Sequence, residues 1–184
     1  MLENSFKLFI LKDESTTYKT YTYVIVEPNS LETIIIDPAC EREKIEQLIA
    51  SYGLKMKYIL LTHTHSDHTA QVEWLYQKYQ IQVCLSTDEA HFYDYYIPNM
   101  KLLNDGDILH MGAINVKCLL TPGHSKGSMC YWIGEKLFTG DTLFIEGCGM
   151  CSAAGASVDE MYQSIQHIKA IIPKNTEIYP GHQY

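Results

Sequence analysis

The sequence predicts an α/β (α+β) fold in which two β-sheets pack face to face and helices cover both outer faces, giving a four-layer αββα sandwich. Two observations lead to this expectation. Strand-like segments followed by helical segments recur in both halves of the chain, the pattern of two packed sheets with outer helices. The 184 residues are 46% hydrophobic and 20% charged, an ordinary globular composition. We therefore expect residues 1–184 to form one domain with a sizeable core.

The first half of the chain alternates strands and helices. Segments rich in β-branched and aromatic residues predict strands at 6–11, 20–26, 33–36, 57–61 and 81–85. Apolar residues at helical spacing predict helices at 41–51 and 67–79. Ser86 and Glu89 form a capping box, the side-chain pair typical of a helix start, for a third helix through about Tyr96.

The second half begins after the turn residues 104–107. Strands are predicted at 108–111, 114–120, 128–133, 136–139 and 176–179. The turn Gly134-Glu135 predicts a hairpin between two of them. Ser157 and Glu160 form a second capping box, which opens a helix to about Ala170.

The Tyr-rich segment 91–100 allows two interpretations. Helical periodicity favours Phe92, Tyr95 and Tyr96 packing on the core. The alternative is that this segment forms a lid over a bound ligand.

Composition excludes several classes of function. A net charge of −8 without a basic face argues against nucleic acid as a partner. No apolar run approaches the ~20 residues of a membrane span, so we expect no membrane partner, and the amino-terminal segment has no small-residue cleavage site. We therefore expect a cytoplasmic location. Because the chain stops two residues after His182 without a terminal helix, we also expect the natural protein to extend past Tyr184.

The cysteines predict little chemistry. Four of the six lie in or beside apolar segments and are expected to be reduced, buried thiols. Cys148 and Cys151 form a C-x-x-C, which fits a redox pair or half of a zinc site, but no second pair accompanies it.

Metal-competent side chains follow the ends of several predicted strands. The stretch THTHSDH, residues 62–68, packs three histidines and an aspartate directly after an apolar strand. His124, Asp141 and His182 each follow a later strand by one to four residues and adjoin a glycine that permits a tight turn. If these strand ends converge, they bring together seven candidate ligands: His63, His65, Asp67, His68, His124, Asp141 and His182.

The donor chemistry indicates the kind of metal. Imidazole and carboxylate donors without thiolate suit catalytic zinc, iron or manganese. Seven donors are too many for one ion that keeps an open position, so we predict two metal ions, with zinc favoured and one carboxylate bridging them. Two ions about 3.5–4 Å apart can hold a bridging hydroxide, because the pKa of bound water falls to about 7.

The motifs T-H-x-H-x-D-H, PGH, G-D-T and a final PGH resemble the metallo-β-lactamase fold, and in particular its glyoxalase II-like hydrolases. The resemblance runs from Tyr21 to the end of the chain. It implies one metal on His63, His65 and His124, a second on Asp67, His68 and His182, and Asp141 as the bridge. It also implies that Asp37 supports the site from behind the ligands. Asp67 and His65 are predicted to be catalytic as well as metal-binding.

The expected reaction is hydrolysis of a thioester by the metal-bridging hydroxide, with one metal stabilising the oxyanion. A thiolate, whose conjugate acid has a pKa near 8.5, leaves without a proton. An amide nitrogen needs a general acid, and no candidate is apparent beyond the ligands.

The substrate's carrier is less closely defined. Glyoxalase II enzymes place a lysine and an aromatic residue after a G-C-G tripeptide, whereas here Met150, Cys151 and Ser152 follow it, and only Tyr184 matches a glutathione-contacting position. The stretch EGCGMCSAAGAS resembles small zinc-dependent hydrolases of bacterial trans-acyltransferase polyketide synthase clusters. That resemblance implies an acyl thioester tethered to a carrier protein, or a small-molecule thioester.

Four other functions remain open at this stage. The first is a hydroxyacylglutathione hydrolase of the glyoxalase II type. The second is a mononuclear iron persulfide dioxygenase, although its usual G-C-G-R-T-D-F is absent because Met150 replaces the arginine. A lactonase and a non-catalytic carrier-protein-binding or metal-binding module are the others.

Overall fold

The computed structural model describes residues 5–13 and 19–182, which fold into two β-sheets flanked by helices. The first sheet has the order β1-β2-β3-β4-β5-β6 and the second the order β11-β10-β9-β8-β7. The strands of the first sheet are β1 (Lys7–Lys12), β2 (Tyr21–Val26), β3 (Glu32–Ile36), β4 (Lys55–Leu60), β5 (Gln82–Ser86) and β6 (Lys101–Leu103). Those of the second are β7 (Ile108–Met111), β8 (Ile114–Leu120), β9 (Met129–Ile133), β10 (Lys136–Gly140) and β11 (Glu177–Pro180).

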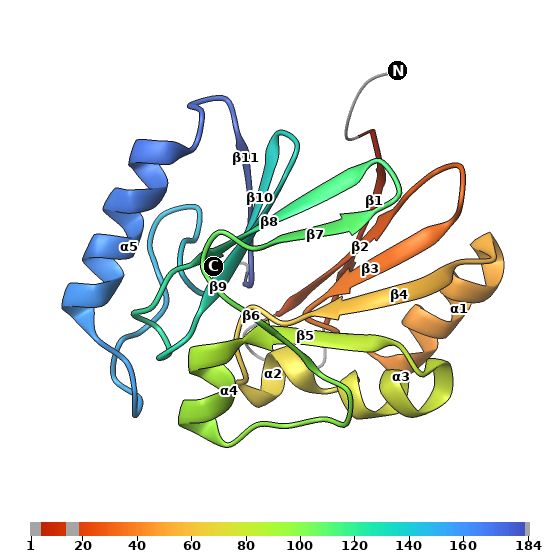
Figure 1. The fold of residues 1–184 in the computed structure, drawn as a ribbon, viewed down its shortest axis with the longest axis horizontal. Helices are drawn as coiled ribbons and strands as arrows, with labels where there is room; N and C mark the ends of the chain where they lie inside the picture. Colours follow the sequence, from red (N-terminus) through yellow and green to blue (C-terminus); the bar gives the residue numbers. More distant parts are fainter. Residues whose placement is uncertain (1–4, 14–18, 183–184) are drawn as a thin grey trace.

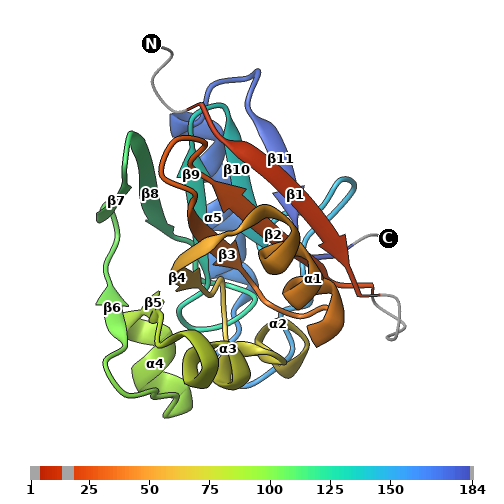
Figure 2. The same cartoon turned by 90° about the vertical axis from the view of Figure 1, so that its right-hand side faces the viewer.

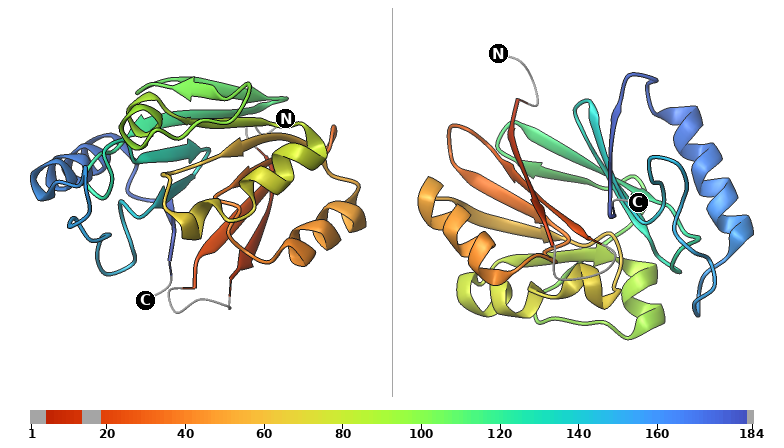
Figure 3. Two further views of the ribbon diagram at one scale, coloured as in Figure 1. Left: turned by 90° about the horizontal axis from the view of Figure 1, so that it is seen from below. Right: turned by 180° about the vertical axis from the view of Figure 1, so that it is seen from behind.

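The helices form the two outer layers. They are α1 (Arg42–Tyr52), α2 (Ser66–Thr69), α3 (Val72–Tyr79), α4 (Thr87–Tyr93) and α5 (Val158–Ile171). Helices α1–α4 lie along the first sheet, and α5 lies on the opposite outer face against the second (Figures 1 and 2). Views from below and behind show the same order of layers (Figure 3). The predicted four-layer αββα sandwich is confirmed.

Three groups of buried side chains hold these layers together. The central group fills the space between the sheets and includes Ile25, Tyr131 and Phe138. A second packs the first sheet against its helices, and a smaller third group packs Ile168 of α5 against the second sheet. Burial of this apolar surface supplies most of the stabilisation, because each fully buried large apolar side chain contributes about 1.5–3 kcal/mol. No helix of the described residues is long and apolar enough to cross a membrane.

Strand direction brings one end of each sheet to a common rim. Strands β3, β4, β5 and β6 are parallel neighbours. Strands β8 and β10 are both antiparallel to β9, and β11 is parallel to β10, so these three also share a direction. At the rim, Met129 N donates to Thr62 O at 2.9 Å and the Tyr131 hydroxyl donates to Leu61 O at 2.6 Å. These bonds join the end of β4 to the second sheet.

Three predicted elements differ from the structure. The helix predicted at 67–79 is broken into α2 and α3, because Gln71 leaves helical geometry and its N–H donates to Pro38 O. The helix expected to reach Tyr96 ends at Tyr93, where Asp94 adopts a left-handed conformation. Strand β6 was not predicted, since its three residues are too short to show a period of two.

The Tyr-rich segment is only partly buried. Tyr95 packs on the core, as periodicity predicts, but Phe92 and Tyr96 are about half exposed, so that prediction is wrong for two of three rings. The Tyr93 hydroxyl donates to Ala154 O at 2.6 Å. Tyr96 borders a separate cavity with Tyr95 and Pro98.

The turn between β2 and β3 depends on the carboxylate of Glu27. Its Oε2 accepts hydrogen bonds from the Ser30 N–H at 2.6 Å and from the Ser30 hydroxyl at 2.7 Å. Asn29 donates to the same carboxylate through its N–H and its amide. Led by the Ser30 N–H, these bonds lower the pKa of Glu27 from 4.5 to about 2.

We expect Glu27→Gln to reduce the free energy of unfolding at pH 7. Because the folded-state pKa lies below the unfolded one, the wild-type advantage is complete above about pH 4.5 and declines as the pH falls toward about 2. Urea unfolding of both proteins across this range measures the difference. A difference that stays constant with pH contradicts the assignment.

Candidate metal centre

All seven candidate ligands lie at the common rim of the two sheets. His63 lies three residues after β4, His124 four residues after β8, Asp141 directly after β10, and His182 two residues after β11. His65 precedes α2, while Asp67 and His68 lie within it. The predicted convergence of strand ends is therefore present.

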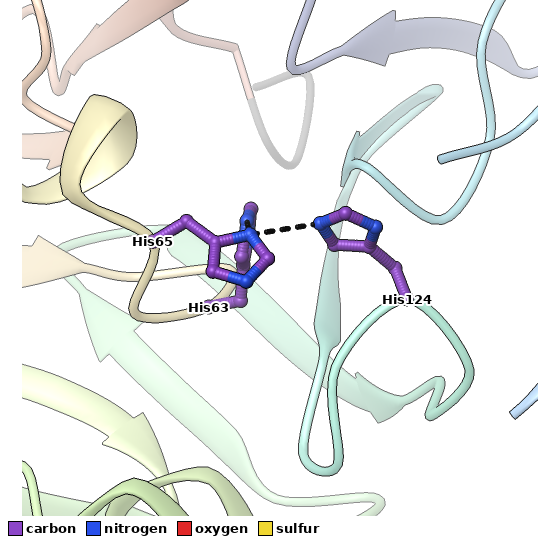
Figure 4. Close-up of side chains that lie close together, drawn as sticks. All are labelled: His63, His65 and His124. Carbon is purple, nitrogen blue, oxygen red and sulfur yellow. Dashed lines mark hydrogen bonds between the residues drawn. The ribbon is translucent and has the colours of Figure 1, made fainter. Parts of the chain in front are cut away.

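Three imidazoles form the first cluster, drawn in Figure 4. His65 Nδ1 lies 3.0 Å from His63 Nε2 and 3.0 Å from His124 Nε2. His63 is fully buried and His124 nearly so, whereas His65 is partly exposed. Three nitrogens that converge on one point, with one of the three rings partly exposed, have the arrangement of a catalytic metal site with a free position.

The other four candidates form overlapping clusters beside the first. Asp67, His68 and His182 place one donor atom each within 4.8 Å of one another, as do His63, His68 and Asp141. His68 Nε2 lies 3.2 Å from His182 Nε2, and Asp67 Oδ2 lies 3.4 Å from His182 Nε2. Asp141 lies between the clusters, with Oδ1 3.4 Å from His68 Nε2 and Oδ2 3.4 Å from His124 Nε2. The position of Asp141 suits a bridge between two ions.

Hydrogen bonds on the outer side of the rings fix which nitrogen faces the site. His124 Nδ1 lies 2.8 Å from the carbonyl oxygen of Met150, and His68 Nδ1 lies 2.9 Å from Asp37 Oδ2. Both partners are acceptors, so each Nδ1 carries the proton, and the Nε2 lone pair points into the site unless that ring is fully protonated. Ligating histidines usually have this kind of outer partner.

Asp37, the residue that the resemblance places behind the ligands, contacts both His68 and Thr62. Besides its bond to His68, its carboxylate accepts from the Thr62 N–H at 2.8 Å and from the Thr62 hydroxyl at 2.7 Å. Asp37 has a φ of 46°, a left-handed conformation that is uncommon outside glycine but is tolerated by aspartate. It thus links the end of β3 to the histidine segment after β4.

Burial and neighbouring charges compete within the site. Burial lowers the pKa of His63 well below its usual value, and the adjacent His68 lowers it further. Burial also acts to lower the pKa of His68, but the carboxylates of Asp37 and Asp141 outweigh it and hold this pKa well above its usual value. Burial acts to raise the pKa of Asp141, yet His182 and His68 outweigh it and keep the pKa of this carboxyl well below its usual range. A metal ion bound at His68 Nε2 would compete with a proton for that nitrogen.

One buried atom tests whether a metal fits. Asp141 Oδ1 is buried and accepts no hydrogen bond from the described residues. His68 Nε2 and His182 Nε2 each lie 3.4 Å from this oxygen without completing a hydrogen bond, and a cation at this point would compensate its negative charge. The donors are imidazole and carboxylate, which suit zinc, iron or manganese. The residues present therefore fit a metal ion.

Several predictions concern residues away from these clusters. Tyr184 lies outside the described residues. Among those described, no cysteine belongs to a group with metal-ligand spacing. The four cysteines predicted to be buried thiols are buried, whereas Cys148 is exposed and Cys151 half-buried. The catalytic roles of Asp67 and His65 stay predictions.

A pocket of about 670 Å³ opens beside the clusters. It is lined by Phe144, Ile145, Glu146, Gly147, Cys148, Met150 and His182. Ile145 is 81% exposed and Met150 is 70% exposed, so large apolar side chains face solvent next to the candidate ligand His182. The volume is in the range of sites that bind small molecules.

Comparison with known proteins places this arrangement in a family. Residues 16–182 match the model of the Metallo-beta-lactamase superfamily. The chain belongs to this superfamily. The probable polyketide biosynthesis zinc-dependent hydrolase BaeB of Bacillus velezensis is 37% identical over 183 residues, which cover 100% of this chain and 81% of that protein. The hydroxyacylglutathione hydrolase of Pelagibacter ubique is 35% identical, with 89% of this chain and 66% of that protein covered.

A solved structure agrees with these relatives. The crystal structure of ETHE1 from Myxococcus xanthus has a TM-score of 0.84 and 28% identity, covering 98% of this chain and 76% of that one. Superfamily, donor set and fold together make this protein a metal-binding enzyme.

Two features of the site were not predicted. The sequence singled out the G-C-G tripeptide and Met150, but Phe144 and Ile145 precede that motif, and only the folded chain places them in the pocket wall beside His182. The carboxylate of Glu89 lies behind the histidine segments, although its sequence context indicated only helix capping.

We expect Gly149→Ala to reduce metal content sharply. An added Cβ would lie 2.5 Å from the Asp141 carbonyl oxygen and 2.6 Å from His124 Nδ1, so both candidate ligands would have to move. Gly147→Ala is the matched control, because a Cβ there meets nothing within 4 Å. Elemental analysis of the purified variants measures bound metal. Equal metal content in both variants would contradict the expectation that close packing of Gly149 against Asp141 and His124 is needed for metal binding.

Proposed function

We propose that this protein is a zinc-dependent hydrolase that cleaves an acyl thioester, with the acyl group presented on a carrier protein or a similar pantetheine arm. The observation that carries the proposal is the position of the clusters: two sets of histidine and aspartate donors open beside an apolar pocket. The named relative BaeB, a probable zinc-dependent hydrolase of polyketide biosynthesis, supports the choice of zinc and of acyl chemistry.

The donor clusters fit two ions. His63, His65 and His124 would hold one, Asp67, His68 and His182 the other, with Asp141 between them. Zinc bound in this way supplies a water whose pKa is lowered to about 7 and polarises the carbonyl that is attacked. The Met150 carbonyl and Asp37 would keep His124 and His68 oriented.

A thioester suits the groups that line the pocket. Beyond the candidate ligand His182, the described lining residues offer only Glu146 and Cys148 as titratable groups. Cleavage of an amide requires a proton donor to the departing nitrogen, and the described lining residues offer no histidine for this role besides that candidate ligand. A thiolate leaves without one, which favours a thioester over an amide.

The charge of the pocket indicates which thiol carries the acyl group of the substrate. Glutathione is anionic, and the described lining residues include no lysine or arginine but do include Glu146. The apolar surface of Ile145 and Met150 instead suits an acyl chain or an uncharged pantetheine arm. These features favour an acyl-pantetheine substrate over acylglutathione.

Asp141→Asn should abolish thioester hydrolysis, because the amide lacks the negative charge of the carboxylate that would be shared by the two ions. Release of free thiol from acyl-pantetheine, acyl-carrier-protein, acyl-CoA and acylglutathione measures turnover. Asp159→Asn, which changes an exposed carboxylate on α5, is the control. The proposal fails if the zinc-loaded wild type cleaves none of these thioesters, or if the iron-loaded protein instead consumes oxygen with glutathione persulfide.

Met150→Lys should raise kcat/KM for acylglutathione relative to acyl-pantetheine. The substitution places a cation at an exposed position on the pocket wall, where it can pair with the carboxylates of glutathione. A gain of about tenfold corresponds to roughly 1.4 kcal/mol of transition-state binding. An unchanged ratio of the two kcat/KM values argues that this wall does not contact the thiol part of the substrate.

A further inference from the structure

Glu89 carries a buried carboxylate that the proposed chemistry does not use. It lies in the first turn of α4, where Ser86 caps the helix by accepting from the Glu89 N–H at 3.1 Å. In a capping box the glutamate side chain would return to the backbone of its own N-cap. Here the side chain points away from its helix and is fully buried.

Four neutral donors surround this carboxylate. Oε1 accepts from the Thr64 N–H and the Thr64 hydroxyl, both at 2.9 Å. Oε2 accepts from the Ser125 hydroxyl at 2.7 Å and from the Gly127 N–H at 2.8 Å. Each oxygen therefore serves one chain segment, and Glu89 joins the two segments directly.

The two segments carry the first donor cluster. Thr64 lies between His63 and His65, and Ser125 follows His124. The first segment extends from β4 of one sheet, and the second extends from β8 of the other. Glu89 thus spans the seam between the sheets at the point where the three imidazole nitrogens must meet.

The surroundings of Glu89 are closely packed. A Cβ at Gly127 would lie 2.1 Å from the Glu89 backbone nitrogen, so this position admits only glycine while the segment rests on α4. The Ser86 hydroxyl donates to the Gly127 carbonyl at 2.5 Å, and the hydroxyls of Ser125 and Ser128 lie 2.6 Å apart. The second segment is therefore held against α4 at several points.

We propose that Glu89 is a positioning residue that fixes the distance between His124 and the pair His63 and His65, and thereby sets the affinity of this cluster for its metal. It acts through hydrogen bonds from the backbone N–H and hydroxyl groups of both segments, and none of these four donors is an imidazole. The inference rests on the proposed function only in that these three histidines hold a metal ion.

Glutamine cannot replace Glu89 here, although the two side chains have nearly the same shape. Each carboxylate oxygen faces a backbone N–H, from Thr64 on one side and Gly127 on the other, and neither N–H can reorient. Whichever way the amide of a glutamine is turned, its NH2 group meets one of these donors. One segment must then shift.

The test compares Glu89→Gln with Asp88→Asn, which removes an exposed carboxylate from the same turn of α4. Zinc affinity is measured by competition with a chromophoric chelator, and the ligand field by the visible spectrum of the cobalt-loaded protein. We expect Glu89→Gln to lower the affinity for one of the two zinc ions by about tenfold or more, as loss of a supporting contact typically does. The visible spectrum of cobalt bound at that site should change as well. The affinity for the second zinc ion should be the same as in the wild type in both variants.

Two results for Glu89→Gln overturn the proposal. The first is zinc affinities and cobalt spectra equal to those of Asp88→Asn. The second is an equal loss of affinity for both zinc ions, which indicates general destabilisation. If Glu89→Gln does not fold, Ser125→Ala removes one of the four bonds and should lower the affinity for the same zinc ion to a smaller extent. Unchanged affinity in Ser125→Ala then overturns it. Zinc binding without thioester cleavage in the wild type would refute the proposed function and leave this inference intact.

Discussion

The structure depends on one constraint: the ligand-bearing ends of two separate sheets must meet in register. Apolar packing between the sheets brings them together but is not directional, so it cannot fix positions to a fraction of an ångström. Hydrogen bonds that cross from one sheet to the other do this. The bonds from Met129 N to Thr62 O and from Tyr131 to Leu61 O join the backbones, and Glu89 joins the histidine segments themselves. The positions of the candidate ligands thus follow from contacts that include no candidate ligand atom.

The contacts behind the ligands also determine the chemistry of the site. Asp37 and the Met150 carbonyl fix the ring orientation of His68 and His124, and burial keeps the pKa of His63 low. A site of this kind holds ligating nitrogens in place before the metal arrives, so little reorganisation is needed on binding. The buried oxygen of Asp141 that accepts no hydrogen bond from the described residues marks where positive charge is required. The clusters adjoin an apolar wall, which would give the proposed acyl substrate its own binding surface.

Much of this arrangement could be predicted from the sequence, because it depends on local patterns. Strands end where apolar runs give way to metal-competent side chains, three of them beside a glycine, and this placed His63, His124, Asp141 and His182 at strand ends. The failures concern long-range contacts. The helix at 67–79 breaks because Gln71 bonds to Pro38, more than thirty residues earlier in the chain. The sequence pattern explained Glu89 as a helix cap, so nothing in it indicated that its carboxylate serves two distant segments. Tertiary hydrogen bonds leave no periodic signature, and only the folded chain reveals them.

The most direct measurement is an anomalous difference map at the zinc absorption edge from a crystal of the zinc-loaded protein. We expect two peaks about 3.5–4 Å apart at the rim, one within bonding distance of His63, His65 and His124 and the other of Asp67, His68 and His182, with Asp141 contacting both. A map without zinc at the rim, or with zinc held by other residues such as Cys148 and Cys151, would contradict the proposed centre.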